Sequence, residues 1–255
     1  MSRSVRHAFA RAIAVGAIAL STLAASAADL TVSAAASLTN AFKEIGAAFE
    51  AQNPGTKVQL NFGASGALLQ QIAKGAPVDA FASADEETMD QAQQRQLVKP
   101  DTRVDFVRNS LVVIVPFDAP SVPKTLADLS PAGIKKVAVG LPASVPVGRY
   151  TKAVLEKAQL WTGIEAKMIG ATSVRQVLDY VARGEVDAGF VYATDAAVMP
   201  DKVKLAFTVP TEKPVLYPIA AMAASTNAAM AAKFVAYVMS APAQEVLAKY
   251  GFAKH

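Results

Sequence analysis

Small and hydroxyl-bearing residues recur where the sequence pattern changes from strand to helix. In the first such junction, AAASLTN, Ser37 follows three alanines and precedes Thr39 and Asn40. In the second, GASG, Ser65 stands beside glycine. The first turn of a helix leaves about four backbone N–H groups without intrahelical acceptors, and with the helix dipole these groups bind anions. Small side chains would let an anion approach the backbone closely.

Two further junctions of this kind occur later in the chain. Pro146-Val147-Gly148 opens one predicted helix, and Thr172-Ser173-Val174 opens another. A serine at a helix start is most often a plain N-cap, and this is the simpler interpretation of any one junction alone. Four junctions, two in each half of the chain, favour an anion site instead.

Charged and phenolic residues near the junctions have less specific interpretations. Arg149, the nearest cation, is expected to face solvent in the first turn of its helix. Asp85, Glu86 and Glu87 stand together at a helix start, where acids interact favourably with the dipole, so a solvated turn is favoured over an acid–base pair. Tyr192, at the end of a predicted strand, could be a hydroxyl donor or a half-buried core residue, and both interpretations stay open.

The residue types that are scarce in the chain argue against several functions. There is no cysteine, and the two histidines are His7, near the start, and His255, the last residue. Disulfides, thiolate metal sites and a Ser-His-Asp triad are therefore not expected. Nucleotide-binding glycine motifs are also missing. We expect a binding protein without a cofactor and not an enzyme; an exported hydrolase using carboxylates, or a structural protein, is the weaker alternative.

The first 27 residues have the pattern of a secretory signal peptide. Three arginines precede an apolar run at 12–23, and Ala25-Ser26-Ala27 is a suitable cleavage site, so the mature chain should begin near Ala28. The apolar run is shorter than the roughly 20 residues that span a bilayer, which argues against a retained anchor. Removing three arginines from 25 basic and 21 acidic residues leaves 22 and 21. We expect a periplasmic monomer that binds no nucleic acid and, without cysteine, carries no lipid anchor.

Helical and strand patterns alternate along the remaining chain. Strands are expected near 30–32, 58–62, 78–83, 110–116, 137–140, 187–195 and 217–225, and helices near 38–49, 63–75, 84–98, 148–160, 173–184 and 227–250. This alternation predicts an α/β fold with two mixed, mostly parallel sheets flanked by helices. The apolar strands predict two lobes joined by two crossings: 29–108 plus 218–255, and 109–217. A cleft between the lobes would hold the ligand.

The same blocks resemble the periplasmic molybdate-binding proteins of ABC transporters. The resemblance is carried by AAASLTNAF (34–42), FGASGALLQQI (62–72), GAPVDAFASAD (75–85), NSLVVIVP (109–116), VPVGRY (145–150), SVRQVLDYVARGEVDAGFVYATDA (173–196) and KYGF (249–252). It covers essentially the whole mature chain, in order. It implies a type II periplasmic-binding-protein fold that closes around one tetrahedral oxyanion and delivers it to an inner-membrane ABC permease.

The resemblance also implies which residues bind the anion, all through hydrogen bonds and without a cationic counter-charge. The implied ligands of molybdate or tungstate are the Ser37 and Ser65 hydroxyls and amides, the Val147 and Val174 amides, and the Tyr192 hydroxyl. Arg149 stands where the resemblance implies an aliphatic residue. Molybdate and tungstate are not distinguished, and another tetrahedral oxyanion such as sulfate is the alternative ligand.

Overall fold

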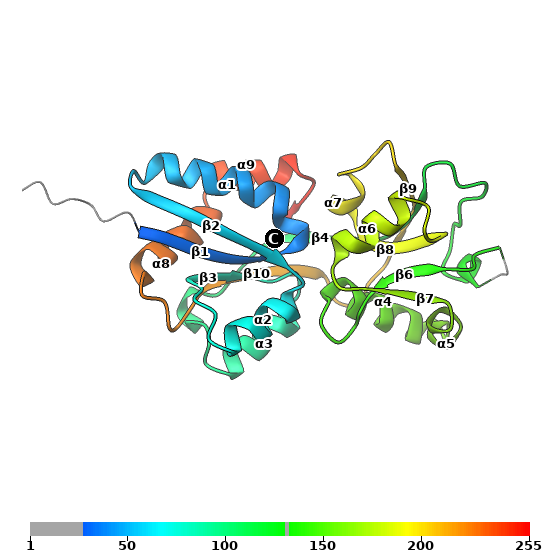
Figure 1. Cartoon of the computed structure of the whole chain (residues 1–255), viewed down its shortest axis with the longest axis horizontal. Helices are drawn as coiled ribbons and strands as arrows, with labels where there is room; N and C mark the ends of the chain where they lie inside the picture. The colour runs from blue at the N-terminus through cyan, green and yellow to red at the C-terminus, as the bar shows by residue number, and fades with distance from the viewer. Residues whose placement is uncertain (1–27, 131–132) are drawn as a thin grey trace, which may run out of the picture.

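The computed structural model describes residues 28–130 and 133–255. The predicted signal peptide, residues 1–27, lies outside the described residues. Two sheets with their flanking helices lie side by side along the long axis of the molecule (Figure 1). Each sheet with its helices is called a lobe below: lobe one contains the N-terminal strand, and lobe two the middle of the chain.

The sheet of lobe one combines parallel and antiparallel pairs. In spatial order its strands are β11 (Ala253–Lys254), β4 (Val104–Asn109), β10 (Val215–Ala221), β3 (Ala80–Ala82), β1 (Ala28–Ala35) and β2 (Thr56–Gly63). Strand β1 pairs in parallel with β2 and β3, whereas β10 runs antiparallel to β3 and β4.

Helices cover both faces of this sheet (Figure 1). They are α1 (Thr39–Gln52), α2 (Ser65–Ala73), α3 (Glu86–Gln94), α8 (Ala228–Val238) and α9 (Ala241–Lys249). The predicted C-terminal helix is thus two helices, because Pro242 in the first turn of α9 has no N–H to continue α8. None of the helices in residues 28–130 and 133–255 has the length and apolar composition that a membrane span requires.

The apolar face predicted for the first helix forms the core of lobe one. Its residues are all at most 1% exposed: Leu38, Ala41, Phe42, Ile45 and Phe49. The ring of Phe49 meets that of Phe234 in α8 edge to face, at a centroid distance of 5.2 Å. Such aromatic pairs add about 0.5–1.5 kcal/mol beyond the burial of their area.

Lobe two is built on the same plan. Its sheet contains, in spatial order, β7 (Met168–Ala171), β6 (Val137–Gly140), β8 (Ala188–Tyr192), β5 (Leu111–Pro116) and β9 (Val203–Val209). Its helices are α4 (Pro146–Lys157), α5 (Trp161–Glu165), α6 (Val174–Ala182) and α7 (Ala193–Ala196). Strand β6 is parallel to β7 and β8, and β5 is antiparallel to β8 and β9.

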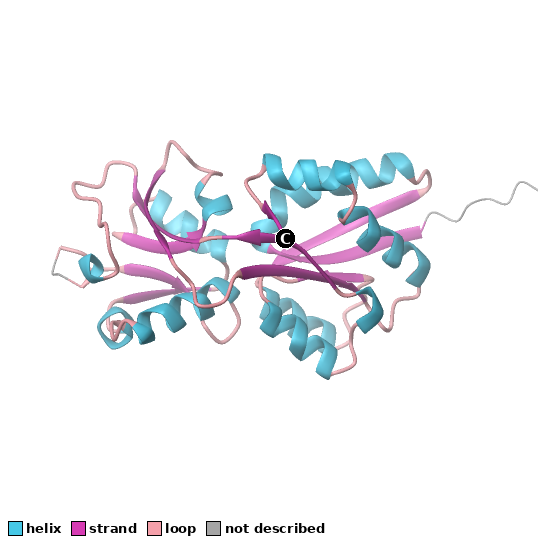
Figure 2. Cartoon of the chain, turned by 180° about the vertical axis from the view of Figure 1, so that it is seen from behind, coloured by secondary structure: helices cyan, strands magenta, loops and turns pink. Residues whose placement is uncertain are grey.

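The chain passes between the lobes at two places, visible from behind in Figure 2. Ser110 joins β4 to β5, and residues 210–214 join β9 to β10. Val215 already pairs with Asn109 in the sheet of lobe one, so residues 215–217 lie in that sheet and not, as expected, in the other lobe. The strands at the crossings pair antiparallel, so parallel pairing is confined to β1–β3 and β6–β8 and is less extensive than predicted.

Four strands were not predicted from the sequence. They are β4, β7, β9 and β11. Strands β7 and β11 have four and two residues, and β9 is a sheet edge whose side chains are partly exposed along most of its length. Strand β4 is longer, but its buried and exposed residues do not alternate. Such strands lack the continuous apolar run or clean alternation by which strands are recognised.

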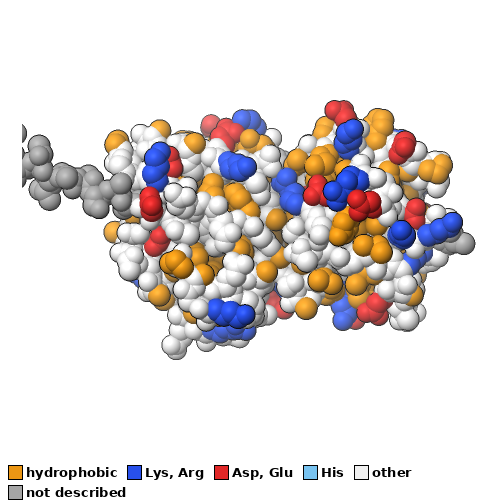
Figure 3. Space-filling view, viewed as in Figure 1, with side chains coloured by type: hydrophobic (Ala, Val, Ile, Leu, Met, Phe, Trp, Pro, Cys, Tyr) orange, Lys and Arg blue, Asp and Glu red, His pale blue; other side chains and the backbone are white. Residues whose placement is uncertain are grey.

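One face of the molecule carries charges of both signs (Figure 3). On the face shown in Figure 3, basic and acidic side chains are interspersed over both lobes. A nucleic-acid-binding face would instead gather Lys and Arg into a patch or stripe.

A glycine in α4 allows the close packing of this helix on β6. A Cβ atom at Gly148 would lie 1.9 Å from the carbonyl oxygen of Gly140. We expect Gly148→Ala to lower the free energy of unfolding by about 1–3 kcal/mol, since the backbone must shift to admit the methyl group. Urea denaturation measures this change. Gly163→Ala in α5 is the matched control, because a Cβ atom there meets nothing within 4 Å; equal urea midpoints for both variants would contradict the prediction.

Candidate functional site

All five predicted ligand residues line one cavity between the lobes. Lobe one contributes Ser37 and Ser65, and lobe two contributes Val147, Val174 and Tyr192. The remaining lining consists of small or apolar residues: Ala35, Ala36, Gly63, Ala64, Ala84, Val145 and Pro146. The space available to the centre of a water-sized sphere is about 10 Å³, about enough for one water molecule. The lobes are therefore in a closed arrangement.

The two serines meet because they follow neighbouring parallel strands. Ala35 at the end of β1 is in register with Gly63 at the end of β2. The carboxyl ends of parallel strands lie at the same edge of a sheet, so the chain beyond each strand enters the cavity from the same side.

Neither serine is a plain N-cap. The N-cap of α1 is Leu38 and that of α2 is Ala64. The Ser65 hydroxyl oxygen instead accepts the backbone N–H of Ala84 at 3.0 Å, and the Ser37 hydroxyl lies 2.9 Å from the hydroxyl of Tyr217. Both serines are buried. The plain-cap interpretation is wrong for these two residues.

Ser173, in contrast, is an ordinary N-cap. Ser173 is the N-cap of α6, and its hydroxyl oxygen accepts the backbone N–H of Gln176 at 3.2 Å. This bond stabilises the start of the helix and leaves the next residue, Val174, in its first turn.

The two valines bring backbone donors from lobe two. Val147 is the second residue of α4, after Pro146, and Val174 is the first residue of α6. A backbone N–H at these positions has no intrahelical acceptor. Since both residues line the cavity, their N–H groups and the positive ends of two helix dipoles lie beside it.

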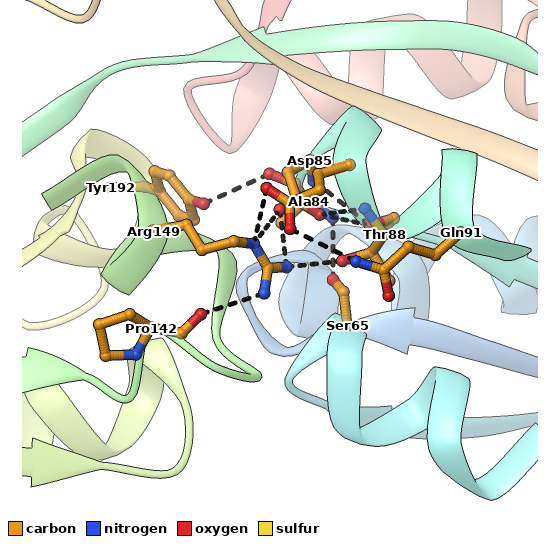
Figure 4. Close-up of polar contacts among 10 residues, drawn as sticks. Ser65, Ala84, Asp85, Thr88, Gln91, Pro142, Arg149 and Tyr192 are labelled. Carbon is orange, nitrogen blue, oxygen red and sulfur yellow. Dashed lines mark hydrogen bonds and ion pairs between the residues drawn. The ribbon is translucent and has the colours of Figure 1, made fainter. Parts of the chain in front are cut away.

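Tyr192 is fully buried, so the half-buried interpretation is wrong. It is 1% exposed, and its hydroxyl donates to the carbonyl oxygen of Ala84 in lobe one at 3.3 Å (Figure 4). Burial raises the pKa of the Tyr192 phenol well above its usual range, so the hydroxyl stays protonated. It is a donor at the cavity wall whose proton now points to Ala84.

Arg149 does not face solvent, contrary to the prediction. Its side chain is 16% exposed and reaches from α4 in lobe two to the start of α3 in lobe one (Figure 4). Its Nε donates to Asp85 Oδ2 at 2.8 Å, and a terminal nitrogen donates to Thr88 Oγ1 at 2.6 Å. Sequence reasoning missed this pair because its members are 64 positions apart.

The acidic turn at the start of α3 is solvated only in part. Asp85 is buried and is the N-cap of α3, so the predicted solvated position is wrong for this residue. Glu87 is exposed and lies 3.7 Å from Arg149 Nε. Because Ala84, the neighbour of Asp85, lines the cavity, the ion pair ties the lobes together directly beside it.

Two more contacts hold the lobes together around the cavity. The backbone N–H of Gly66 donates to the carbonyl oxygen of Ser144 at 3.0 Å. A terminal nitrogen of Arg175 lies 3.4 Å from the carbonyl oxygen of Ser37, and its Nε donates to Asp195 Oδ1 at 2.6 Å. The arginine charge is thus balanced within lobe two while the side chain reaches lobe one.

Asp195 is a buried carboxylate that is only partly satisfied. Its Oδ2 has no hydrogen-bond partner among the described residues. Burial raises the pKa of the Asp195 carboxyl to about 6, and the Arg175 guanidinium offsets part of that rise. The charged form is therefore less favourable in the folded protein than in the unfolded chain.

This burial predicts a pH dependence of stability. An aspartate in an unfolded chain has a pKa of about 3.9, so between about pH 4 and pH 6 the folded protein binds the proton that the unfolded chain has released. The contribution of Asp195 to the free energy of unfolding should fall as pH rises through this range and stay constant above it. Urea unfolding between pH 4 and pH 8 should show this fall in the free energy of unfolding for the wild type, and the fall should be absent in Asp195→Asn. A constant difference between the two proteins would contradict the prediction.

Comparison with known proteins identifies the family. Residues 30–253 match the family described as bacterial extracellular solute-binding protein. The chain is 37% identical to the molybdate-binding protein ModA of Escherichia coli over 231 residues, 88% of each chain. It is also 37% identical over 229 residues to YvgL of Bacillus subtilis, provisionally named an ABC transporter substrate-binding lipoprotein, covering 88% of this chain and 85% of that one.

The fold has a close counterpart among solved structures. The periplasmic molybdate-binding protein of Azotobacter vinelandii matches with a TM-score of 0.78 over 89% of this chain and 99% of that one, at 24% identity. These comparisons confirm the predicted fold class, the resemblance to the molybdate-binding proteins, and a binding rather than an enzymatic role. The chain belongs to the bacterial extracellular solute-binding proteins, in the family that includes ModA.

Proposed function

We propose that the protein captures molybdate or tungstate between its lobes in the periplasm and delivers the ion to an inner-membrane ABC permease. The observation that carries the proposal is the convergence of Ser37, Ser65, Val147, Val174 and Tyr192 on one cavity. The resemblance assigns these five positions to the oxyanion, and they come from segments far apart in the chain. The relatives named for molybdate binding support the choice of ligand.

The chemistry of the cavity suits a compact dianion. Among the described residues that line it, none carries a charged side chain. Hydroxyl and backbone N–H donors, with two helix dipoles, can satisfy the several acceptor positions of each oxyanion oxygen. Selectivity follows from fit: around the smaller sulfate, donors placed for molybdate would stay unpaired, at about 1–3 kcal/mol for each buried group.

Entry of the ion requires the lobes to move. The lining comes from both lobes, and most of its residues are buried in the closed arrangement, so we propose that the lobes part and close around the two crossings. The Arg149–Asp85 ion pair and the Gly66–Ser144 hydrogen bond then form on closure and stabilise the closed state. A permease that recognises both lobes would bind this state preferentially.

Binding measurements test the ligand. We expect molybdate and tungstate to raise the melting temperature of the purified protein and sulfate and phosphate to have little effect; a ligand at 100 times its Kd adds about 2.7 kcal/mol of stability. Ser37→Ala and Ser65→Ala should each weaken molybdate binding about tenfold in calorimetric titration, through the loss of one buried hydrogen bond. Ser121→Ala, at an exposed loop position, is the control. A shift with sulfate and none with molybdate would establish the sulfate alternative.

A substitution at Gly66 tests closure. A Cβ atom at Gly66 would lie 2.7 Å from the carbonyl oxygen of Ser144 in the other lobe. Gly66→Ala should therefore hold the lobes apart and weaken molybdate binding at least about tenfold, without loss of stability, since alanine favours a helix over glycine by about 1 kcal/mol. Calorimetric titration and urea unfolding measure the two effects, with Gly163→Ala as control. Unchanged affinity would show that closure does not depend on this contact.

A further inference from the structure

A chain of hydrogen bonds leads from one crossing to the cavity. Asn109, the last residue of β4, has its Nδ2 3.2 Å from the Tyr217 hydroxyl. That hydroxyl lies 2.9 Å from the Ser37 hydroxyl, which lines the cavity. Tyr217 is fully buried in β10, so its hydroxyl must find its partners within the protein.

The amide of Asn109 sets the direction of this chain. Its Oδ1 accepts the backbone N–H of Ser110 at 2.9 Å. The amide nitrogen therefore faces the other way, toward the Tyr217 hydroxyl and toward Thr194 Oγ1 at 2.8 Å. An amide nitrogen only donates, so the Tyr217 oxygen is the acceptor of this bond.

The single proton of Tyr217 then belongs to Ser37. Burial raises the pKa of the Tyr217 phenol well above its usual range, so the proton is retained. Among the described residues, Ser37 Oγ is the remaining hydrogen-bond partner of the Tyr217 hydroxyl. Were Ser37 to donate instead, the buried phenol proton would have no acceptor. Ser37 thus accepts from Tyr217, and its own proton is free for the cavity.

Ser65, like Ser37, accepts a hydrogen bond from the protein, but from a backbone N–H group. Ser65 Oγ accepts the backbone N–H of Ala84, which can only donate, and no described residue accepts the Ser65 proton, so this proton is also available to the cavity. Both serines and the Val147 and Val174 amides thus present protons to the cavity. An oxyanion oxygen that carries a proton of its own would meet another proton at this wall.

We propose that Asn109 and Tyr217 are positioning residues that fix the Ser37 proton toward the cavity, so that the site takes fully deprotonated oxyanions and rejects protonated ones such as hydrogen phosphate. The inference deepens the proposed function and rests on it. Neither residue belongs to the five implied ligands, and neither lines the cavity.

A double-mutant cycle tests the coupling of Tyr217 to Ser37. Molybdate affinity is measured by calorimetric titration for the wild type, Ser37→Ala, Tyr217→Phe and the double variant. We expect Tyr217→Phe to weaken binding about tenfold and the double variant to bind no more weakly than Ser37→Ala alone. Tyr237→Phe, which removes the phenolic hydroxyl that contacts Gln52 in lobe one, should leave affinity unchanged. Losses that multiply in the double variant would overturn the proposal.

Discrimination against inorganic phosphate separates this role from a merely structural one. In Tyr217→Phe the Ser37 hydroxyl can turn and accept, so the affinity for phosphate relative to molybdate should rise about tenfold. A loss of structure alone would weaken the binding of phosphate and of molybdate in the same proportion. An unchanged ratio of the two affinities would therefore count against the proposal.

Asn109→Asp tests the direction of the hydrogen bonds and does not depend on the folding of Tyr217→Phe. The new carboxylate accepts the phenol proton, so Ser37 must donate to Tyr217 and turn its lone pairs to the cavity. Molybdate affinity should fall at least 100-fold, and by much less in the Ser37→Ala background. An equal loss of molybdate affinity in both backgrounds would assign the effect to the added charge and overturn the proposal.

If the wild type binds sulfate and not molybdate, the proposed function fails. The same variants titrated with sulfate then still test the role of Asn109 and Tyr217.

Discussion

The cavity depends on how closely the backbones of the two lobes can approach. The Gly66 N–H and the Ser144 carbonyl oxygen form a hydrogen bond between the lobes, with no room for a Cβ atom at Gly66. Donors from both lobes can converge on one small ion only if the walls come within this distance. The alanines beside Ser37 meet the same requirement, because larger side chains would fill the space that hydroxyls and amides now border.

Charge is arranged around the cavity in a regular way. Arg149 follows Val147 by two positions, and Arg175 follows Val174 directly, so each lobe-two helix that brings an amide also carries a guanidinium nearby. Each arginine is bonded to a buried carboxylate and also reaches lobe one. The positive charge of each arginine is thus compensated outside the cavity lining, so recognition of the proposed anion would rest on neutral donors.

Local features of the site could be predicted from sequence, and its long-range partners could not. The junctions that contain Ser37, Ser65 and Val147 were recognised because small and hydroxyl residues where a strand passes into a helix indicate an anion site, and the family resemblance then implied the individual ligands. The partner of Ser37 is Tyr217, 180 positions away, and nothing in either segment indicates the pairing. Arg149 was misjudged for the same reason. The α1 core face followed from helical periodicity. Strands β7, β9 and β11 were missed because short and edge strands carry weak patterns, and β4 because its burial does not alternate.

The position of Asn109 at a crossing has a consequence for the order in which a ligand is bound. Asn109, Tyr217 and Ser37 all belong to lobe one, and Asn109 adjoins the crossing at Ser110. The hydrogen bonds among these three residues lie within one lobe, so the proposed separation of the lobes would leave them in place. In the proposed mechanism, the ion would first bind to the preorganised donors of lobe one, and lobe two would complete the coordination afterwards. The rate at which the ion is captured would then depend on lobe one, and the time for which it stays bound would depend on both lobes.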